Sequence, residues 1–196
     1  MPSFLATRHS DTMKSSRIGY VDDAQVAFAE APFVQAERAA VGDLGYEVVS
    51  ITARNVVPAE LDATLSTLDG LYVASGSTFA LLEALRTSGN DAVVVRHVQA
   101  GLPYIGSSAG SIIAGPDVTP ASLMDDPADG PSLKDFTGLG LVDRTVIPHA
   151  DGKIPPYPPE LIAETLATYG TSHDLLPLRD DQALLVEGAV QQVIAS

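Results

Sequence analysis

A Gly-Ser-Ser-Ala-Gly pentapeptide at residues 106–110 constrains the fold of this chain more than any other stretch. The apolar residues 102–105 before it are typical of a buried strand, and the small and apolar residues 111–114 after it are typical of the start of a helix. A G-x-S-x-G sequence between a strand and a helix predicts a nucleophile elbow, a strained turn that lifts the serine out of the sheet. Ser108 is then the candidate nucleophile, and the N–H group of Ala109 is a candidate oxyanion donor.

A turn of this composition also occurs where a sheet binds phosphate, or where a helix merely packs closely against a strand. The rest of the chain supplies context, because strand patterns alternate with helix patterns. Strands are expected at 17–24, 46–51, 71–74, 102–105 and 142–147, and helices at 26–41 (restarted by Pro32), 58–68, 79–85 and 159–169. This alternation predicts an α/β fold with a layered, mostly parallel sheet flanked by helices.

Three further segments complete this prediction. Residues 91–100 contain three consecutive valines, which favour a strand, but a crossover helix is needed before the strand of the elbow, so we expect a helix. The tail predicts short strands at 175–178, 183–186 and 190–195, with a hairpin turn at 187–188. Residues 117–138, rich in Pro, Asp and Gly, are expected to form a long loop beside the active site.

We expect residues 1–196 to form a single domain, because no linker or repeat divides the chain. No apolar run approaches the roughly 18 residues of a membrane helix, and the first residues lack the apolar stretch of a secretory signal. Cysteine is absent, which excludes disulfides, thiolate metal sites and cysteine nucleophiles. These features are compatible with the cytoplasm, and that location is our expectation.

The formal net charge of −14 argues against nucleic acid and anionic membranes as partners, because both require a positive field. No cluster of His, Asp and Glu has a convincing metal-ligand spacing, so we expect neither a metal nor another cofactor. The sequence carries no signal for the oligomeric state.

A serine nucleophile needs a base, and the chain has four histidines. His149 directly follows the strand at 142–147, and the carboxyl ends of strands are where α/β sheets place their chemistry. His149 is therefore the preferred base and His173 the second choice, whereas His9 lies in a polar segment and His97 in an apolar one.

The acid that would orient the histidine is harder to choose. Two pairs of aspartates stand out, Asp125 with Asp126 in the loop after the elbow, and Asp180 with Asp181 just before the strand at 183–186. Spacing alone leaves all four open.

Four blocks of the chain, residues 73–79, 101–110, 138–149 and 178–184, resemble blocks of the peptidase E family, the aspartyl dipeptidases and their relatives, which include cyanophycinase. They occur in the family's order. The resemblance implies a Ser-His-acid serine peptidase on a fold close to that of the class I glutamine amidotransferases, whose own chemistry is excluded here because it requires a cysteine.

Carried over to this chain, the resemblance makes Ser108 the nucleophile, His149 the general base, and the N–H groups of Gly76 and Ala109 the oxyanion donors. Asp180 occupies the position where the family usually has Glu. Because Asp is one methylene shorter, it must approach His149 more closely or act through water, and this keeps the other three aspartates open. In the turn around Gly76, serines at 75 and 77 replace a Gly and the Asn of the family pattern.

The resemblance further implies a small peptide substrate, most simply a dipeptide with an N-terminal aspartate. Arg54, Arg144 and Arg179 are the candidates for binding its side-chain carboxylate. Two alternatives are the β-linked aspartyl-arginine unit of cyanophycin as substrate, and a non-catalytic binding module that retains the elbow as scaffold.

Overall fold

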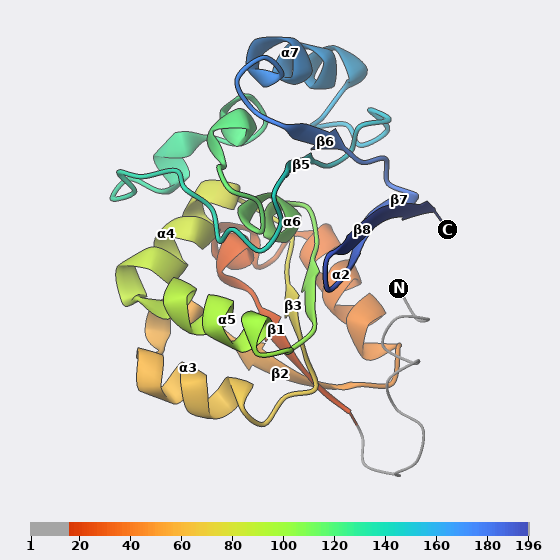
Figure 1. Ribbon diagram of the computed structural model, residues 1–196. Coiled ribbons are helices and arrows are strands. Elements are labelled where there is room, and N and C mark those ends of the chain that lie inside the picture. The colour runs from red at the N-terminus through yellow and green to blue at the C-terminus, as the bar shows by residue number, and fades with distance from the viewer. Residues whose placement is uncertain (1–15, 196) are drawn as a thin grey trace.

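A four-stranded parallel sheet forms the centre of the computed structural model, which describes residues 16–195 (Figure 1). His9, one of the four histidines considered above, lies outside these residues. The strands run in the order β2-β1-β3-β4, with bounds β1 Arg17–Val21, β2 Glu47–Ile51, β3 Gly70–Val73 and β4 Tyr104–Gly106.

Helices cover both faces of this sheet, which confirms the predicted α/β layers (Figure 1). One face carries α2, and the other carries α3, α4 and α5; the bounds are α2 Pro32–Gly42, α3 Pro58–Leu65, α4 Thr78–Ser88 and α5 Asn90–Gln99. Short 3-10 helices follow two of the strands, η1 at Asp23–Phe28 and η2 at Ala53–Asn55. The helix expected at 91–100 is confirmed by α5, and Pro32 takes the first position of α2 as expected.

The central strands β1 and β3 are largely apolar because helices cover both faces of the sheet, and β3 is buried along its whole length. Alternate residues of β1 point to opposite sides: Ile18 and Tyr20 pack in the cluster beneath α2, and Val21 packs in the larger cluster beneath α3 to α5. The Tyr20 ring stacks on Tyr72 of β3 at 5.4 Å between centroids. Apolar packing on both faces therefore stabilises the sheet.

The second half of the chain extends beyond the carboxyl ends of these strands (Figure 1). Its elements are α6 Ala109–Ile113, η3 Thr119–Leu123, η4 Pro127–Asp129, β5 Thr145–Ile147, α7 Pro159–Tyr169, β6 Leu175–Pro177, β7 Gln182–Glu187 and β8 Val190–Ala195. β5 pairs in parallel with β6, and β7 with β8 forms an antiparallel hairpin.

Several boundaries differ from the sequence-based expectation: the strand expected at 17–24 ends at Val21, the one expected at 102–105 lies at Tyr104–Gly106, and two further differences have a clear cause. The strand expected from residue 142 begins only at Thr145, because the N–H groups of Leu141 and Val142 donate to the carbonyl of Ala114 at the end of α6 instead of to a strand. The hairpin turn lies at residues 188–189, one position later than expected, with Gly188 at a φ of 61° that favours glycine.

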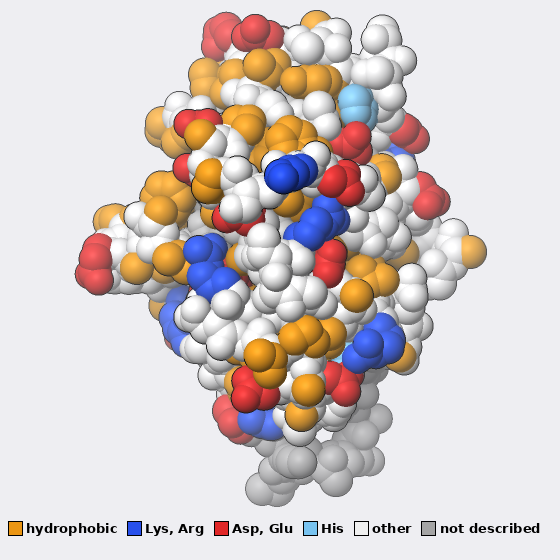
Figure 2. All heavy atoms as spheres, turned by 90° about the vertical axis from the view of Figure 1, so that its left-hand side faces the viewer, with side chains coloured by type: hydrophobic (Ala, Val, Ile, Leu, Met, Phe, Trp, Pro, Cys, Tyr) orange, Lys and Arg blue, Asp and Glu red, His pale blue; other side chains and the backbone are white. Residues whose placement is uncertain are grey.

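The sheet order creates a natural site for ligands. The chain passes from β1 outward to β2 and then returns across β1 to β3, so the connections leave β1 and β3 in opposite directions. In open α/β sheets, ligands bind outside the carboxyl ends of the strands at such a switch point. Of the helices in the described part, none is long and apolar enough to cross a membrane. On the face shown in Figure 2, acidic and basic side chains are interspersed rather than segregated.

Candidate active site

The pentapeptide forms a tight elbow between β4 and α6. Ser108 has φ 46° and ψ −106°, a conformation that costs a non-glycine residue about 1–3 kcal/mol. The flanking glycines are required by close contacts, because a Cβ added at Gly106 would lie 2.4 Å from the carbonyl oxygen of Gly110, and one added at Gly110 would lie 2.2 Å from that of Val73. The hydroxyl of Tyr104 donates to the Gly110 carbonyl at 2.6 Å and holds the elbow against its own strand.

Replacing Gly110 with alanine is expected to destabilise the protein by about 3 kcal/mol, because the added methyl meets backbone that cannot move aside. Equilibrium unfolding in urea measures the loss. Gly42→Ala is the matched control, since a Cβ at Gly42 meets nothing within 4 Å and alanine is the better helix former by about 0.5–1 kcal/mol. Equal stability of the two variants would contradict the close packing of the elbow.

His149 follows β5 and faces the serine. Its Nε2 atom lies 3.0 Å from Ser108 Oγ, and its Nδ1 atom lies 2.7 Å from Asp180 Oδ1. An ionised carboxylate only accepts hydrogen bonds, so Nδ1 carries the proton and the Nε2 lone pair faces the serine hydroxyl. The backbone of His149 is also left-handed, with φ 59°, and its side chain is 15% exposed. The three side chains form one continuous hydrogen-bonded chain.

The structure separates the four candidate acids. Asp180, 34% exposed, contacts His149 directly, so the shorter side chain needs no bridging water. Asp181 pairs with Arg179 through two hydrogen bonds, at 2.9 and 3.1 Å, and this arginine lowers the pKa of Asp181. Asp126 accepts from the N–H group of Ala128 and caps η4.

Asp125 reaches the site from the other side, through Tyr157. The Tyr157 ring stacks on the His149 ring with centroids 4.9 Å apart, and its hydroxyl donates to Asp125 Oδ1 at 3.2 Å. Asp125 Oδ2 accepts the N–H and the hydroxyl of Thr78, at 3.0 and 2.5 Å. Burial, and next the Asp125 charge, raise the pKa of Tyr157, so its hydroxyl stays protonated. Sequence reasoning missed Tyr157, whose only signal is an aromatic side chain between prolines shortly after His149.

The turn at residues 75–78 joins β3 to α4 and lies at the same edge of the sheet. Gly76 has φ 129°, and a Cβ there would lie 2.3 Å from the Ala24 carbonyl oxygen, which already accepts the N–H of Ser77 at 2.9 Å. The Ser77 hydroxyl accepts from Ala80 N and caps α4, which accounts for a serine at this position. Within residues 16–195, the N–H of Gly76 has no hydrogen-bond acceptor, and the N–H of Ala109 belongs to the first turn of α6, which lacks intrahelical acceptors.

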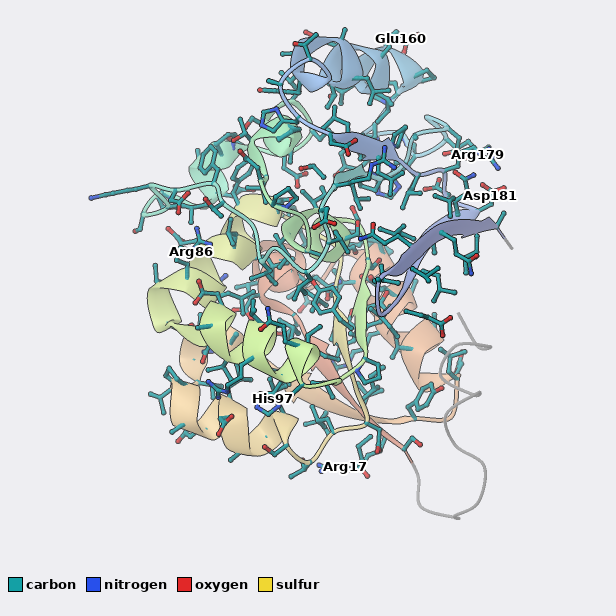
Figure 3. The ribbon with its side chains drawn as sticks, viewed as in Figure 1. Arg17, Arg86, His97, Glu160, Arg179 and Asp181 are labelled. Atoms are coloured by element: carbon teal, nitrogen blue, oxygen red, sulfur yellow. The ribbon has the colours of Figure 1, made fainter. Side chains whose placement is uncertain are left out.

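The remaining candidates are engaged elsewhere. His97 Nε2 contacts Asp62 at 2.7 Å, and His173 Nε2 lies 3.4 Å from Asp117. Figure 3 shows His97 on α5, far below Arg179 and Asp181, which lie together near the hairpin of β7 and β8. Among the described residues, no group of three or more His, Asp or Glu side chains could hold a metal ion.

Comparison with known proteins identifies relatives over nearly the whole chain. The model of peptidase family S51 matches residues 4–194. An uncharacterized peptidase of Pasteurella multocida is 35% identical over 168 residues, which cover 85% of this chain and 73% of the relative. A peptidase E of Streptomyces coelicolor is 33% identical over 155 residues, covering 77% of this chain and 60% of the relative.

Solved structures share the fold. A crystal structure of a candidate peptidase E protein from Listeria monocytogenes has a TM-score of 0.85 at 24% identity and covers 98% of this chain and 92% of its own. A peptidase from an acI-B1 Actinobacterium has a TM-score of 0.71 at 18% identity, covering 100% and 80%. With the family match, these findings confirm the predicted resemblance: the chain belongs to peptidase family S51, the serine peptidases that include peptidase E.

Proposed function

We propose that this serine peptidase hydrolyses short peptides through a triad of Ser108, His149 and Asp180. The observation that carries the proposal is the continuous chain of contacts from Ser108 Oγ to His149 at 3.0 Å and from His149 to Asp180 at 2.7 Å. This is the arrangement that activates a serine hydroxyl, because the carboxylate fixes the imidazole tautomer and the imidazole takes the hydroxyl proton.

The first half of the reaction forms an acyl-enzyme. Ser108 Oγ attacks the peptide carbonyl carbon while its proton passes to His149 Nε2, and the carbonyl oxygen becomes an oxyanion. The N–H groups of Gly76 and Ala109 stabilise this oxyanion, and Asp180 stabilises the imidazolium. The C–N bond then breaks as His149 returns the proton to the leaving amine.

Water completes the cycle by the reverse sequence. His149 takes a proton from the water that attacks the acyl carbon, the same two N–H groups stabilise the second oxyanion, and the Ser108 oxygen leaves with the proton from His149. The products are a carboxylic acid and the free enzyme.

We further propose an N-terminal aspartate as the preferred first residue of the substrate. Of the three candidate arginines, Arg54 pairs with Asp23, whose side chain is fully buried, and Arg144 pairs with Asp174. Arg179 is 50% exposed and directly precedes Asp180, so it is the candidate beside the triad, although Asp181 already binds it. A substrate carboxylate would share this guanidinium with Asp181, which five N–H donors permit.

A matched panel of dipeptides tests this proposal. We expect Asp-Leu to be cleaved with a higher kcat/KM than its neutral isostere Asn-Leu, by about tenfold or more, since a charge-assisted hydrogen bond contributes about 1.5–3 kcal/mol. Leu-Asp serves as the control for the position of the charge, and release of the free amine is measured.

The outcomes separate the parts of the proposal. Equal cleavage of Asp-Leu and Asn-Leu would contradict the aspartyl preference alone. Cleavage of β-aspartyl-arginine, with no alpha-linked dipeptide cleaved, would show the cyanophycin-type substrate instead. A wild-type protein that cleaves nothing in the panel and is not labelled at Ser108 by a fluorophosphonate would contradict the triad itself.

A further inference from the structure

Glu37 of α2 makes an unusual set of contacts with the end of β3. Its carboxylate accepts the N–H of Ser75 at 3.2 and 3.3 Å and the Ser75 hydroxyl at 2.5 Å. It also accepts the Tyr72 hydroxyl at 2.8 Å and the side-chain amide of Gln25 at 2.6 Å. The two carboxylate oxygens of one partly buried side chain therefore bind four donor groups.

The partners of Glu37 are themselves held in place. Gln25 is buried and accepts the Tyr20 hydroxyl at 3.1 Å, which orients its amide nitrogen towards Glu37. Burial, and next the Glu37 charge, raise the pKa of Tyr72 far above its ordinary value, so its hydroxyl stays a donor. Burial likewise raises the pKa of Tyr20 to about 12. The carboxylate, carried by α2, is thus held in place by donors from β3 and η1.

These contacts complete a series of anchors along the 75–78 turn. Glu37 binds Ser75, the Ala24 carbonyl accepts the N–H of Ser77, and Asp125 accepts the N–H of Thr78. Gly76 lies between the first two anchors, and its N–H is the group that this series leaves for a ligand. A shift of the Ser75 backbone would rotate the peptide unit that carries this N–H.

We infer that Glu37 is a positioning residue for the reaction: it holds Ser75 and thereby aims the Gly76 N–H at the oxyanion. The inference rests on the oxyanion role proposed above for Gly76. It also assigns a use to Ser75, whose hydroxyl and N–H both bind the carboxylate where the family pattern has a glycine.

Electrostatics alone predicts the opposite effect for the loss of this carboxylate. A negative charge near the developing oxyanion disfavours it, so neutralising Glu37 without moving the turn would speed the reaction. Positioning predicts a slower reaction, because glutamine keeps the shape but offers a single acceptor oxygen and turns an NH2 group towards the donors. The direction of the change therefore distinguishes the two effects.

The experiment measures phosphonylation of Ser108 by a tagged fluorophosphonate, in which the serine oxygen bonds to phosphorus, fluoride leaves and His149 takes the proton. We expect Glu37→Gln to lower the limiting rate kinact by about tenfold to a hundredfold, with KI within about twofold of wild type, since the turn acts on the transition state and not on ground-state binding. Glu30→Gln, an exposed glutamate before α2, is the matched control and should keep both constants.

A double-mutant cycle with Ser75→Ala tests the contact itself. The single variant should lose less than Glu37→Gln because its N–H still binds the carboxylate, and the double variant should be no slower than Glu37→Gln alone. Thermal unfolding confirms that each variant is folded, and if Glu37→Gln is not, Ser75→Ala alone carries the test.

Each outcome has a distinct meaning. If kinact for Glu37→Gln is at or above the wild-type value while Ser108→Ala is not labelled, the positioning role is overturned and the proposed function stands. The same conclusion follows if kinact for Ser75→Ala is unchanged, or if the losses of the two single variants add up fully in the double variant. Wild-type protein that is not labelled at Ser108 overturns the proposed function, and this inference with it.

Discussion

Replacing Ser108 with alanine is expected to lower kcat by about 10⁴- to 10⁶-fold, with little change in stability. The substitution removes the oxygen that forms the acyl-enzyme, while the two N–H groups and the binding surface remain to give weak residual catalysis. The fold should persist because the elbow is held through the Ser108 carbonyl, which accepts the N–H of Ser111 at 2.8 Å and its hydroxyl at 2.6 Å. Alanine keeps this backbone group.

The effect is measured as steady-state initial rates on the dipeptide of the panel that the wild-type protein cleaves with the highest kcat/KM. Thermal unfolding is measured in parallel. Ser107→Ala is the matched comparison, because it changes the neighbouring serine of the same pentapeptide and should stay within a few-fold of wild type. A large loss of kcat for Ser107→Ala together with a small loss for Ser108→Ala would identify Ser107 as the nucleophile instead of Ser108.

Asp180→Asn is the second change with a large expected effect, a fall in kcat of about 10⁴-fold. The Asp180 carboxylate, 2.7 Å from His149 Nδ1, can only accept, and so it keeps the proton on Nδ1. An asparagine can turn its NH2 group towards Nδ1, which moves the ring proton to Nε2 and removes the lone pair that must accept the serine proton. KM should change little, because in the proposed mechanism this carboxylate acts on His149 and not on the substrate.

Three further variants serve as comparisons. Asp43→Asn, at the exposed end of α2, should leave kcat unchanged. Asp181→Asn removes the partner of Arg179 and not that of His149, so a loss as large as that of Asp180→Asn would contradict the assignment of Asp180. Asp180→Glu introduces the acid usual in the family, and partial activity is expected because it keeps the carboxylate and the Asp180 side chain is only partly buried, at 34% exposed.

The sheet and its helices could be predicted because local signals and long-range requirements agreed. Parallel strands buried on both faces give continuous apolar runs, and Pro32 and Pro159 mark helix starts that the structure reproduces. Residues 91–100 show the limit of local signals, since their valines favour a strand and only the need for a crossover predicted a helix. The late start of β5 depended on a contact with Ala114, which no local pattern reveals.

Some residues of the candidate site have a local sequence signal, and others do not. Ser108 lies in a local motif and His149 at a strand end, so both could be named from sequence. Spacing alone could not choose between Asp180 and Asp181, because neighbouring residues of a turn point in different directions, and only the family resemblance favoured Asp180. Glu37 gave no signal at all, since it binds Ser75 from an alanine-rich helix 38 residues away.

The residues of the proposed triad come from two different sheets. Ser108 follows β4 of the central sheet, whereas His149 and Asp180 follow β5 and β6, which pair only with each other among the described strands and are joined again beyond their ends by the bond from Ala150 N to the Leu178 carbonyl at 2.9 Å. The base and its carboxylate are therefore carried by one pair of strands and the nucleophile by another sheet. A shift of one sheet relative to the other would lengthen the contact between Ser108 and His149 and leave the contact between His149 and Asp180 unchanged. The packing between the two sheets therefore determines the distance from the nucleophile to its base.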